Sequence, residues 1–426
     1  MLKNLFVVLF LIFATNSIAQ KPNSREKDSI KNVQDSIKKA DLIKNIGNGF
    51  MPFNYFKADL RYLVKFNQYE GFRTGLGGIT NDRFSERFRI NTYLVYGFKD
   101  KAFKYRIGGG FRVDEPSNTW INLSYTDDLS ETGSSNFLTD KRFFTFFEPR
   151  LLNIDLFHKH ITKAIAIEHR LSNHLLSETQ FALSKIDPTY EYNFVLDDRT
   201  YHTFDLSTAK ISLQWSPFST FDIVKDRVET VVDGYPKFTL QLTQGVKSVF
   251  GSDFNFSKID FRTIQQFNHK NDAITKITLV AGIAGGETPL THLYHAYPNN
   301  ITKETILQRF SVAGLNSFET MYFNEFFSDK FSTLQLKHYL KPFKISERFK
   351  PQLVFISRYA VGNMRSIDRH QGINFGTIEK LYSESGFEIN KLLFGFGLSF
   401  AYRYGGYHLP KLEDNIAFKF TFNISL

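Results

Sequence analysis

Cysteine is absent from the 426 residues of this sequence. That absence excludes disulfide bonds, thiolate chemistry, cysteine-based zinc sites and the lipid-modified cysteine of a lipoprotein. Long apolar runs are missing as well, because no stretch approaches the roughly 20 consecutive apolar residues that a membrane helix requires. The mean hydropathy of −0.27 agrees with this pattern. A bundle of membrane helices is therefore excluded, whereas a membrane β-barrel is not, since its lumen-facing residues dilute its hydropathy.

Charge of one sign is not concentrated anywhere along the chain. The sequence has 53 Lys and Arg against 43 Asp and Glu, a formal net charge of +10, which would suit nucleic acid or anionic lipid. The basic residues are interleaved with acids throughout, so the compact basic footprint of a nucleic-acid-binding surface is missing. We therefore expect no nucleic-acid partner.

The first 19 residues carry the features of a secretory signal peptide. Lys3 supplies a basic start, residues 5–14 form an apolar run, and Ser17 and Ala19 place small residues before a cleavage site at Gln20. An anchoring helix is disfavoured because the run is too short to span a bilayer. Residues 20–50 are polar and charged, and we expect a periplasmic tether, although two short heptads also permit a brief amphipathic helix.

Aromatic residues are abundant, with 47 Phe and 20 Tyr making up most of a 16% aromatic content, and they favour strands. The clearest pattern lies in residues 392–426. The even positions from 392 to 404 and from 416 to 426 are Leu, Ile, Phe or Tyr, and the odd positions are mostly small or polar. This alternation puts the two sets on opposite faces of a strand. We expect a closing hairpin of a membrane barrel, with the Phe residues at 418, 420 and 422 facing lipid and Lys419, Thr421 and Asn423 facing the lumen.

Strand-like segments recur from residue 51 to 426 with little helical periodicity between them. We count about sixteen, with fourteen also possible, because boundaries taken from one sequence shift by a few residues. They span 55–66, 70–81, 87–98, 102–113, 118–129, 160–172, 177–186, 203–215, 236–247, 254–267, 272–284, 331–343, 349–362, 379–391, 392–404 and 415–426. Only a closed sheet satisfies every backbone polar group in lipid, and the blade repeats of a propeller are missing. The fold prediction is all-β: a transmembrane antiparallel β-barrel with a partly plugged lumen.

Four sequence motifs resemble a known family. They are residues 66–110, FETMYFNEFFSDKF (318–331), LYSESGFEINKLL (381–393) and YRYGGYHLP with DNIAFKF (402–420). Together they are similar to a Bacteroidota outer-membrane barrel family of unknown function, whose members usually carry an N-terminal carboxypeptidase-regulatory-like domain. That domain is missing before residue 51. More distantly, the arrangement resembles the BamA-type assembly and two-partner-secretion superfamily, which implies sixteen strands and a long extracellular loop folded into the lumen.

The longest break between strands, residues 285–330, falls where that loop would lie, although the Arg-Gly tip motif of the superfamily is not present. It follows an odd-numbered strand, which puts it on the extracellular side. Its many aromatic residues would be costly in water, so we expect a lumen plug whose acids pair with basic lumen side chains. An ordinary solvated loop is the alternative. The candidate plug residues are Phe318, Glu319, Asn324, Glu325, Phe326 and Asp329, and the candidate lumen partners are Arg358, Arg365 and Arg403.

Signals of enzyme chemistry are weak. His292 and His295 form a His-x-x-His pair in the same break, but no helical motif with a Glu ligand accompanies them, so hydrogen bonding is favoured over metal binding. The other histidines are dispersed without a nucleophile motif. The Gly-rich pieces at 75–78, 108–110 and 285–286 lack a phosphate-loop context and instead indicate strand kinks or close packing against a plug. The sequence predicts no enzyme activity, no metal and no cofactor.

Three functions remain open for such a barrel. The first, which we favour, is a structural or interaction component of an outer-membrane complex, with outer-membrane lipid and other outer-membrane or periplasmic proteins as partners. The second is a channel for small solutes, in which the lumen residues set selectivity. The third and least favoured is an outer-membrane enzyme. All three place the protein in the cell outer membrane.

Overall fold

The computed structural model describes residues 39, 42–43, 45–140, 149–152, 154–224, 227–303, 311–346, 349–393 and 395–422. The predicted signal peptide, most of the tether, and positions 423–426 lie outside these residues. The chain divides into two units, Met1–Ile46 and Gly47–Leu426. In the first unit, residues 42–43 and 45–46 have helical conformation. No described helix has the length and apolar character that a membrane crossing requires.

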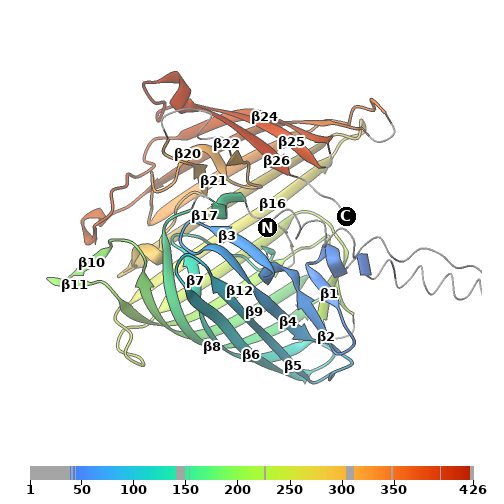
Figure 1. Cartoon of the computed structure of the whole chain (residues 1–426), viewed down its shortest axis with the longest axis vertical. Helices are drawn as coiled ribbons and strands as arrows, with labels where there is room; N and C mark the ends of the chain where they lie inside the picture. Colours follow the sequence, from blue (N-terminus) through green and yellow to red (C-terminus); the bar gives the residue numbers. More distant parts are fainter. Residues whose placement is uncertain are drawn as a thin grey trace, which may run out of the picture. The chain divides into compact units, whose positions relative to one another are not determined.

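The second unit is dominated by one sheet of 19 strands, which curls into a barrel (Figure 1). Its long strands pair antiparallel in chain order. They are β4 (Gly71–Thr80), β5 (Phe88–Gly97), β6 (Ala102–Asp114), β7 (Thr119–Glu131), β8 (Phe157–Ser172), β9 (Leu175–Pro188), β12 (Phe204–Trp215), β15 (Lys237–Gly245), β16 (Phe256–Asn268), β17 (Ile274–Gly286), β21 (Lys330–Tyr339), β22 (Gln352–Asn363), β24 (Tyr382–Leu393), β25 (Phe396–Gly405) and β26 (Ile416–Phe422).

The first wall strand is broken in the middle. β2 (Phe56–Asp59) pairs with residues 78–80 of β4, and β3 (Val64–Asn67) pairs with residues 71–74 of the same strand. A short helix, η1 (Leu60–Tyr62), separates β2 from β3. A short strand, β1 (Phe50–Pro52), pairs with β2. With β2 and β3 taken as one broken strand beside the fifteen long strands, the wall has sixteen. The all-β barrel prediction of about sixteen strands is confirmed, and every predicted range overlaps one of them.

Alternation along the strands separates two faces of the wall. In β26, Lys419 and Thr421 are buried while Phe418 and Phe420 are 46% and 42% exposed, as the sequence predicts. The Phe422 side chain and Asn423 lie outside the described parts. The same parity continues into β25, where Ser399 and Arg403 are buried. In these two strands, small and polar side chains therefore face the lumen, and large apolar ones face outward.

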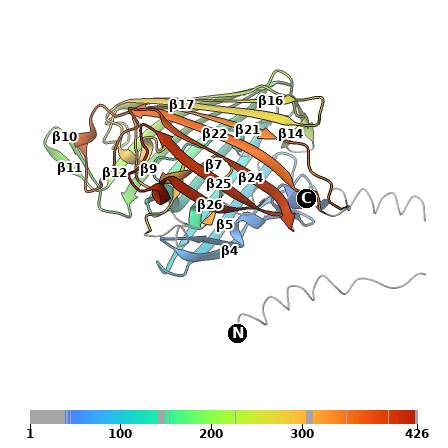
Figure 2. The ribbon, with the colours of Figure 1, turned by 90° about the horizontal axis from the view of Figure 1, so that it is seen from above.

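The two ends of the barrel differ in the length of their connections (Figure 2). At one end, here called the loop end, the strands are joined by residues 132–156, 189–203, 246–255, 287–329, 364–381 and 406–415. At the opposite turn end the connections include 115–118, 173–174 and 394–395. Short turns at one end and long loops at the other are typical of outer-membrane barrels.

Several connections carry small strands of their own. At the loop end, β10 (Asn193–Leu196) pairs with β11 (Arg199–Tyr201) and with β23 (His370–Gln371). At the turn end, the long connection 216–236 holds the hairpin of β13 (Thr220–Val224) and β14 (Arg227–Val232). This connection lies at the end of the barrel opposite residues 287–329.

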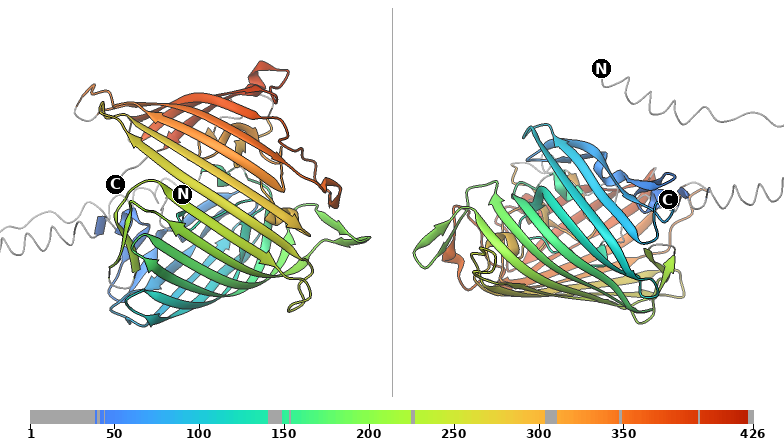
Figure 3. Two further views of the ribbon diagram at one scale, coloured as in Figure 1. Left: turned by 180° about the vertical axis from the view of Figure 1, so that it is seen from behind. Right: turned by 90° about the horizontal axis from the view of Figure 1, so that it is seen from below.

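The first and last wall strands are not hydrogen-bonded to each other within the described residues. Instead, the free edge of β26 pairs in parallel with β19 (Ser311–Val312), a short strand of the 287–329 connection. The Ala313 amide extends this ladder by donating to the Phe420 carbonyl at 2.7 Å. The views from behind and below in Figure 3 show how the sheet curls from its first strands to its last.

Candidate functional site

The described residues of the 287–329 connection, 287–303 and 311–329, are here called the inward loop, and they fold against the lumen face of the wall. The loop contains η4 (Leu290–His292), β18 (Pro298–Asn300), β19 and β20 (Phe318–Tyr322), and β18 pairs in parallel with β20. Its apolar side chains share one buried cluster with lumen-facing wall residues. From the loop these are Leu290, Leu293, Tyr294 and Phe327, and from the wall they include Phe204, Phe256, Val280, Ala284 and Phe331. Burial of these side chains supplies the driving force for the loop's position.

A glycine in the wall makes room for the loop. A Cβ on Gly282 of β17 would lie 2.6 Å from the Tyr294 ring, which is far inside van der Waals contact. That ring stacks on Phe331 of β21 at 4.5 Å between centroids. The close approach of a plug that the sequence suggests for 75–78, 108–110 or 285–286 thus occurs at Gly282, whereas a Cβ on Gly285 would have nothing within 4 Å.

Glu319 of β20 is the most heavily bonded acid of the inward loop. Its carboxylate lies 3.2 Å from Nζ of Lys419 in β26. It also accepts hydrogen bonds from the loop itself, from Asn299 Nδ2 at 2.8 Å, Ser317 Oγ at 2.8 Å and the Gly314 amide at 3.1 Å. Lys419 in addition donates to the Asn299 carbonyl. One buried carboxylate therefore holds three parts of the loop together and fastens them to the last described strand.

Glu384 of β24 holds the backbone of β20 from the wall side. Its carboxylate accepts from the Glu319 amide at 3.0 Å and the Thr320 amide at 2.9 Å, and from Thr320 Oγ1 at 2.6 Å. Arg358 of β22 donates to the same carboxylate at 2.6 Å and lies 4.0 Å from Glu319. A wall carboxylate thus binds loop amides in the way that charge-assisted hydrogen bonds fix a segment in one register.

Arg403 of β25 holds the tip of the loop. Its guanidinium makes two bonds to Glu325, at 2.7 and 3.1 Å, and lies over the Tyr382 ring at 4.7 Å. Phe326 packs edge-on against Tyr382 and Tyr407. This bidentate geometry, combined with stacking on an aromatic face, is specific to arginine.

The buried charges at the centre of this site balance. Glu319, Glu384, Arg358 and Lys419 are each 1% exposed, and they supply two negative and two positive charges. Buried ions carry a large desolvation cost that only good geometry and full hydrogen bonding offset. Removing one member therefore leaves an uncompensated charge in a site closed to water.

The structure places the remaining predicted residues as follows. Phe318 is buried edge-on against Tyr382 at 5.5 Å, and Asn324 donates to Asp155 at 2.9 Å near the surface. Asp329 accepts from the Arg365 backbone amide at 2.9 Å. The Arg365 side chain is exposed and makes no ion pair with a loop acid within the described ranges, unlike those of Arg358 and Arg403.

Sequence reasoning missed Glu384 and Tyr382, and it placed Lys419 in the lumen without assigning it a partner. Their signal is parity: Glu384 shares the lumen face of β24 with Glu388, and Lys419 shares that of β26 with Thr421. An ionisable residue at a lumen-facing position of a strand is a candidate partner for a charged plug. Which loop acid it meets depends on contacts 65 to 100 residues away in sequence, and no local pattern reports those.

The His-x-x-His pair makes packing and hydrogen-bonding contacts. His295 Nε2 lies 2.6 Å from Glu131 Oε1, and the His292 ring lies beside His158 and Phe256. Burial, together with the nearby Lys258 ammonium, lowers the pKa of His292 to about 3. In the part of the chain that the structure describes, no three acidic or histidine side chains are grouped to hold a metal ion.

Three solved structures are similar to this chain, and the first of them shows its fold. BamA from Haemophilus ducreyi, in a crystal structure lacking POTRA domains 1-3, aligns with a TM-score of 0.51 at 9% identity, over 87% of this chain and 70% of that one. CdiB from Acinetobacter baumannii aligns at 0.43 and 11% identity, over 83% and 57%. CdiB from Escherichia coli aligns at 0.45 and 10%, over 87% and 62%.

No curated protein sequence matches the chain. Residues 53–284 match a family described as "Family of unknown function (DUF5686) C-terminal domain". The match covers β2 to most of β17, more than half of the sequence, and it includes the motif at 66–110 that carries the resemblance noted above. The chain therefore belongs to this DUF5686 C-terminal family.

Proposed function

We propose that this protein is an integral outer-membrane barrel, closed by its inward loop, that serves as a structural or interaction component of an outer-membrane complex. The observation that carries the proposal is the buried group of Glu319, Glu384, Arg358 and Lys419. It fastens the loop to three wall strands, and Arg403 adds a fourth. A loop held this firmly favours a closed lumen over a solute path.

The outward face supports the membrane location. Large apolar side chains such as Leu76, Ile107 and Leu123 are 61% exposed or more, and a soluble protein rarely exposes so much contiguous apolar surface. A lipid-facing apolar band is what a membrane barrel requires. The signal-peptide features of residues 1–19 and the motif resemblance support export to the outer membrane of a member of the Bacteroidota.

The loop end supports a role in binding other proteins. β10 and β11 come from one connection and β23 from another, so two distant loops build a single small sheet there. Tyr192 and His370 join them through a hydrogen bond of 2.8 Å. Such a preformed surface on a rigid barrel suits contact with a protein partner.

Two measurements test the proposal. In planar bilayers we expect wild-type protein to conduct little and a variant lacking 287–329 to conduct more. A wild-type conductance equal to that of the deletion variant would contradict a closed lumen. Extraction in mild detergent should bring down co-purifying membrane or periplasmic proteins, and recovery of a lone monomer would contradict the complex.

A small-anion channel is the second candidate. Lys258, Arg262, Lys276 and Lys337 all occupy lumen-facing positions on the adjacent strands β16, β17 and β21. Arg262 and Lys337 are paired with Asp140 and Glu388, so Lys258 and Lys276 supply the charge that would favour anions in a pore. The reversal potential across a KCl gradient separates the two candidates: a strong chloride preference with a substantial wild-type conductance supports the channel and counts against the closed barrel.

A further inference from the structure

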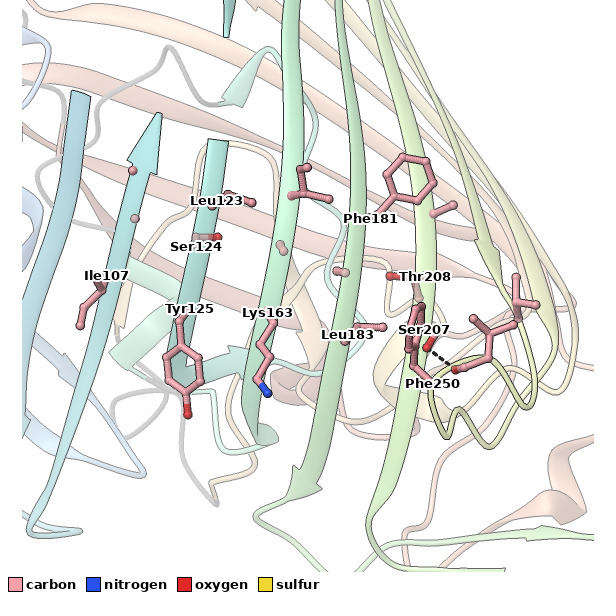
Figure 4. A pocket seen from close by; sticks show the side chains of 18 residues that line it. Ile107, Leu123, Ser124, Tyr125, Lys163, Phe181, Leu183, Ser207, Thr208 and Phe250 are labelled. Carbon is pink, nitrogen blue, oxygen red and sulfur yellow. Dashed lines mark hydrogen bonds between the residues drawn. The ribbon is translucent and has the colours of Figure 1, made fainter. Parts of the chain in front are cut away.

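We propose that the outer wall of the barrel holds one phosphate-bearing lipid, with an acyl chain in an apolar groove and the phosphate at Lys163. The inference rests on the membrane location proposed above and adds a ligand to it. The groove has a volume of about 740 Å³ and crosses β6, β7, β8, β9 and β12 toward the loop end (Figure 4). That volume lies within the range of pockets that bind small ligands.

Small side chains stand at both sides of the groove. Gly109 of β6 and Ala209 of β12 stand at outward positions at the two ends of one row across the strands, and the larger outward residues Leu123, Ile165 and Phe181 lie between them. Along most of the wall, outward positions carry large apolar residues. The two small residues therefore leave room for an acyl chain on either side of these larger side chains.

A loop closes one side of the trough. The connection 246–255 is tied to β12 through Ser207, whose Oγ donates to the Val249 carbonyl at 2.6 Å and whose amide donates to Ser252 Oγ at 3.0 Å. The loop presents Phe250, which is 82% exposed. The exposed ring on a pinned loop gives the groove an apolar side that an acyl chain can contact.

Lys163 gives the groove a charged end. It faces outward on β8, and its direct neighbours on the same face are uncharged: Ile161 and Ile165 along the strand, Tyr125 and Leu183 across it. The next row toward the loop end carries one acid, Asp127, and one base, Lys185, on either side of Ile161. Among the described residues no ion-pair partner is found for its ammonium. A cation on a lipid-facing wall is poorly solvated by its surroundings, and an anion at its tip offsets that cost.

The direction of the side chains decides the occupant. Figure 4 shows the tips of Tyr125 and Lys163 pointing the same way, away from Leu123. On β7 the direction from Leu123 to Tyr125 leads toward the loop end. On β8 the direction from Ile165 to Lys163 leads the same way. The apolar part of the groove therefore lies deeper in the wall and the cation nearer its rim, which is the order of acyl chain and phosphate in a lipid of the adjoining leaflet.

The test compares lipid retention by full-length variants, followed by native mass spectrometry after delipidation and titration. The probes are phosphatidylglycerol and phosphatidylcholine with identical acyl chains. Wild type should bind one phosphatidylglycerol about fivefold more tightly than phosphatidylcholine, as expected for one lysine at an anionic headgroup. Lys163→Gln should abolish this preference. Lys330→Gln, which removes an outward lysine at the same end on β21, should keep it.

Gly109→Leu tests the apolar part of the site. A Cβ at Gly109 meets nothing closer than the Arg89 carbonyl at 3.9 Å, so the new side chain fits the strand and fills the groove. It should weaken retention of both lipids about tenfold, the effect of displacing two methylenes. The proposal would be overturned by any of three results. Gly109→Leu retains both lipids as wild type does, Lys163→Gln still prefers phosphatidylglycerol, or inorganic phosphate displaces the lipid. Failure of wild type to insert into nanodiscs would instead overturn the membrane location.

Discussion

The carboxylate of Glu319 lies 3.2 Å from the ammonium of Lys419, although the two residues are 100 positions apart in the chain. Glu319 belongs to the inward loop and Lys419 to β26, the strand whose free edge β19 of the same loop covers. Both side chains are 1% exposed. The pair thus couples the position of the loop to the last described strand of the wall. The free-energy cost of burying either charge depends on the presence of the other.

Replacing Glu319 by Gln should destabilise the barrel. The change keeps the volume but leaves Lys419 and part of the Arg358 charge without compensation, which costs about 3 kcal/mol for a buried pair that loses one member. Urea unfolding of the protein in lipid vesicles measures the difference.

The matched control is Glu287→Gln. Glu287 pairs with Lys247 at 3.2 Å near the surface, and exposed pairs contribute about 1 kcal/mol or less. The double variant Glu319→Gln with Lys419→Met removes both buried charges and should recover part of the loss. Equal effects of the two single Gln variants would show that the buried group does not hold the loop.

Arg403→Lys should loosen the tip of the inward loop while leaving its centre in place. Lysine keeps the charge but cannot make two parallel bonds to Glu325 and lie flat on Tyr382. We expect a loss of about 1–2 kcal/mol in loop docking, seen as faster limited proteolysis within the inward loop.

Arg365→Lys is the control for that change, because the Arg365 side chain is exposed and only its backbone amide meets Asp329 in the described structure. Its proteolysis rate should equal that of wild type. If both variants are cleaved alike, then the two bonds between Arg403 and Glu325 do not restrain the loop.

The wall of the barrel is predictable from sequence because each strand carries its own signal. Alternation in residues 416–422 decides which face is lipid and which is lumen, since neighbouring side chains on a strand must point to opposite faces. That local rule also places Lys419 and Arg403 in the lumen. The alternation rule fails at residues 130–156. Described residues there, such as Phe137, pack into the buried cluster although the sequence shows no alternation of apolar and polar residues.

The partners inside the lumen are not predictable in the same way. Glu319 and Glu325 were identified as docking acids, but the pairing of Glu325 with Arg403 and of Glu319 with Lys419 depends on how far the loop reaches along the wall. That reach is set by contacts such as Tyr294 on Gly282, between side chains that carry no motif. Charge complementarity narrows the candidates, and only three-dimensional register selects among them.

Gly282→Ala should displace the inward loop without altering any charge. The new Cβ would lie 2.6 Å from the Tyr294 ring and 2.8 Å from Phe331, and overpacking of this kind costs about 1–3 kcal/mol. We expect a lower midpoint of thermal unfolding in detergent. Gly285→Ala is the control, because nothing lies within 4 Å of a Cβ at that position. A comparable drop in the unfolding midpoint of that variant would show that contact with the loop is not the cause.

Acid should weaken docking of the inward loop through His292. Its pKa is lowered to about 3 in the folded protein, mainly by burial and by Lys258, from an ordinary value near 6.5. The unfolded chain therefore binds more protons than the folded one between these two values. The stability is fully present above about pH 6.5 and is lost as the pH falls, by about 1–2 kcal/mol at pH 5. Unfolding free energies measured between pH 8 and pH 5 give this slope.

His292→Leu should flatten the pH dependence, because leucine keeps apolar contact with Phe256 and removes the titrating ring. The slope should shrink rather than vanish, since His158 lies beside His292 at 6.5 Å between ring centroids and is itself buried. His202→Leu, at an exposed position of the 189–203 connection, should keep the wild-type slope. A full wild-type slope in His292→Leu would mean that the acid sensitivity arises elsewhere in the barrel, and that protonation inside the loop does not set it.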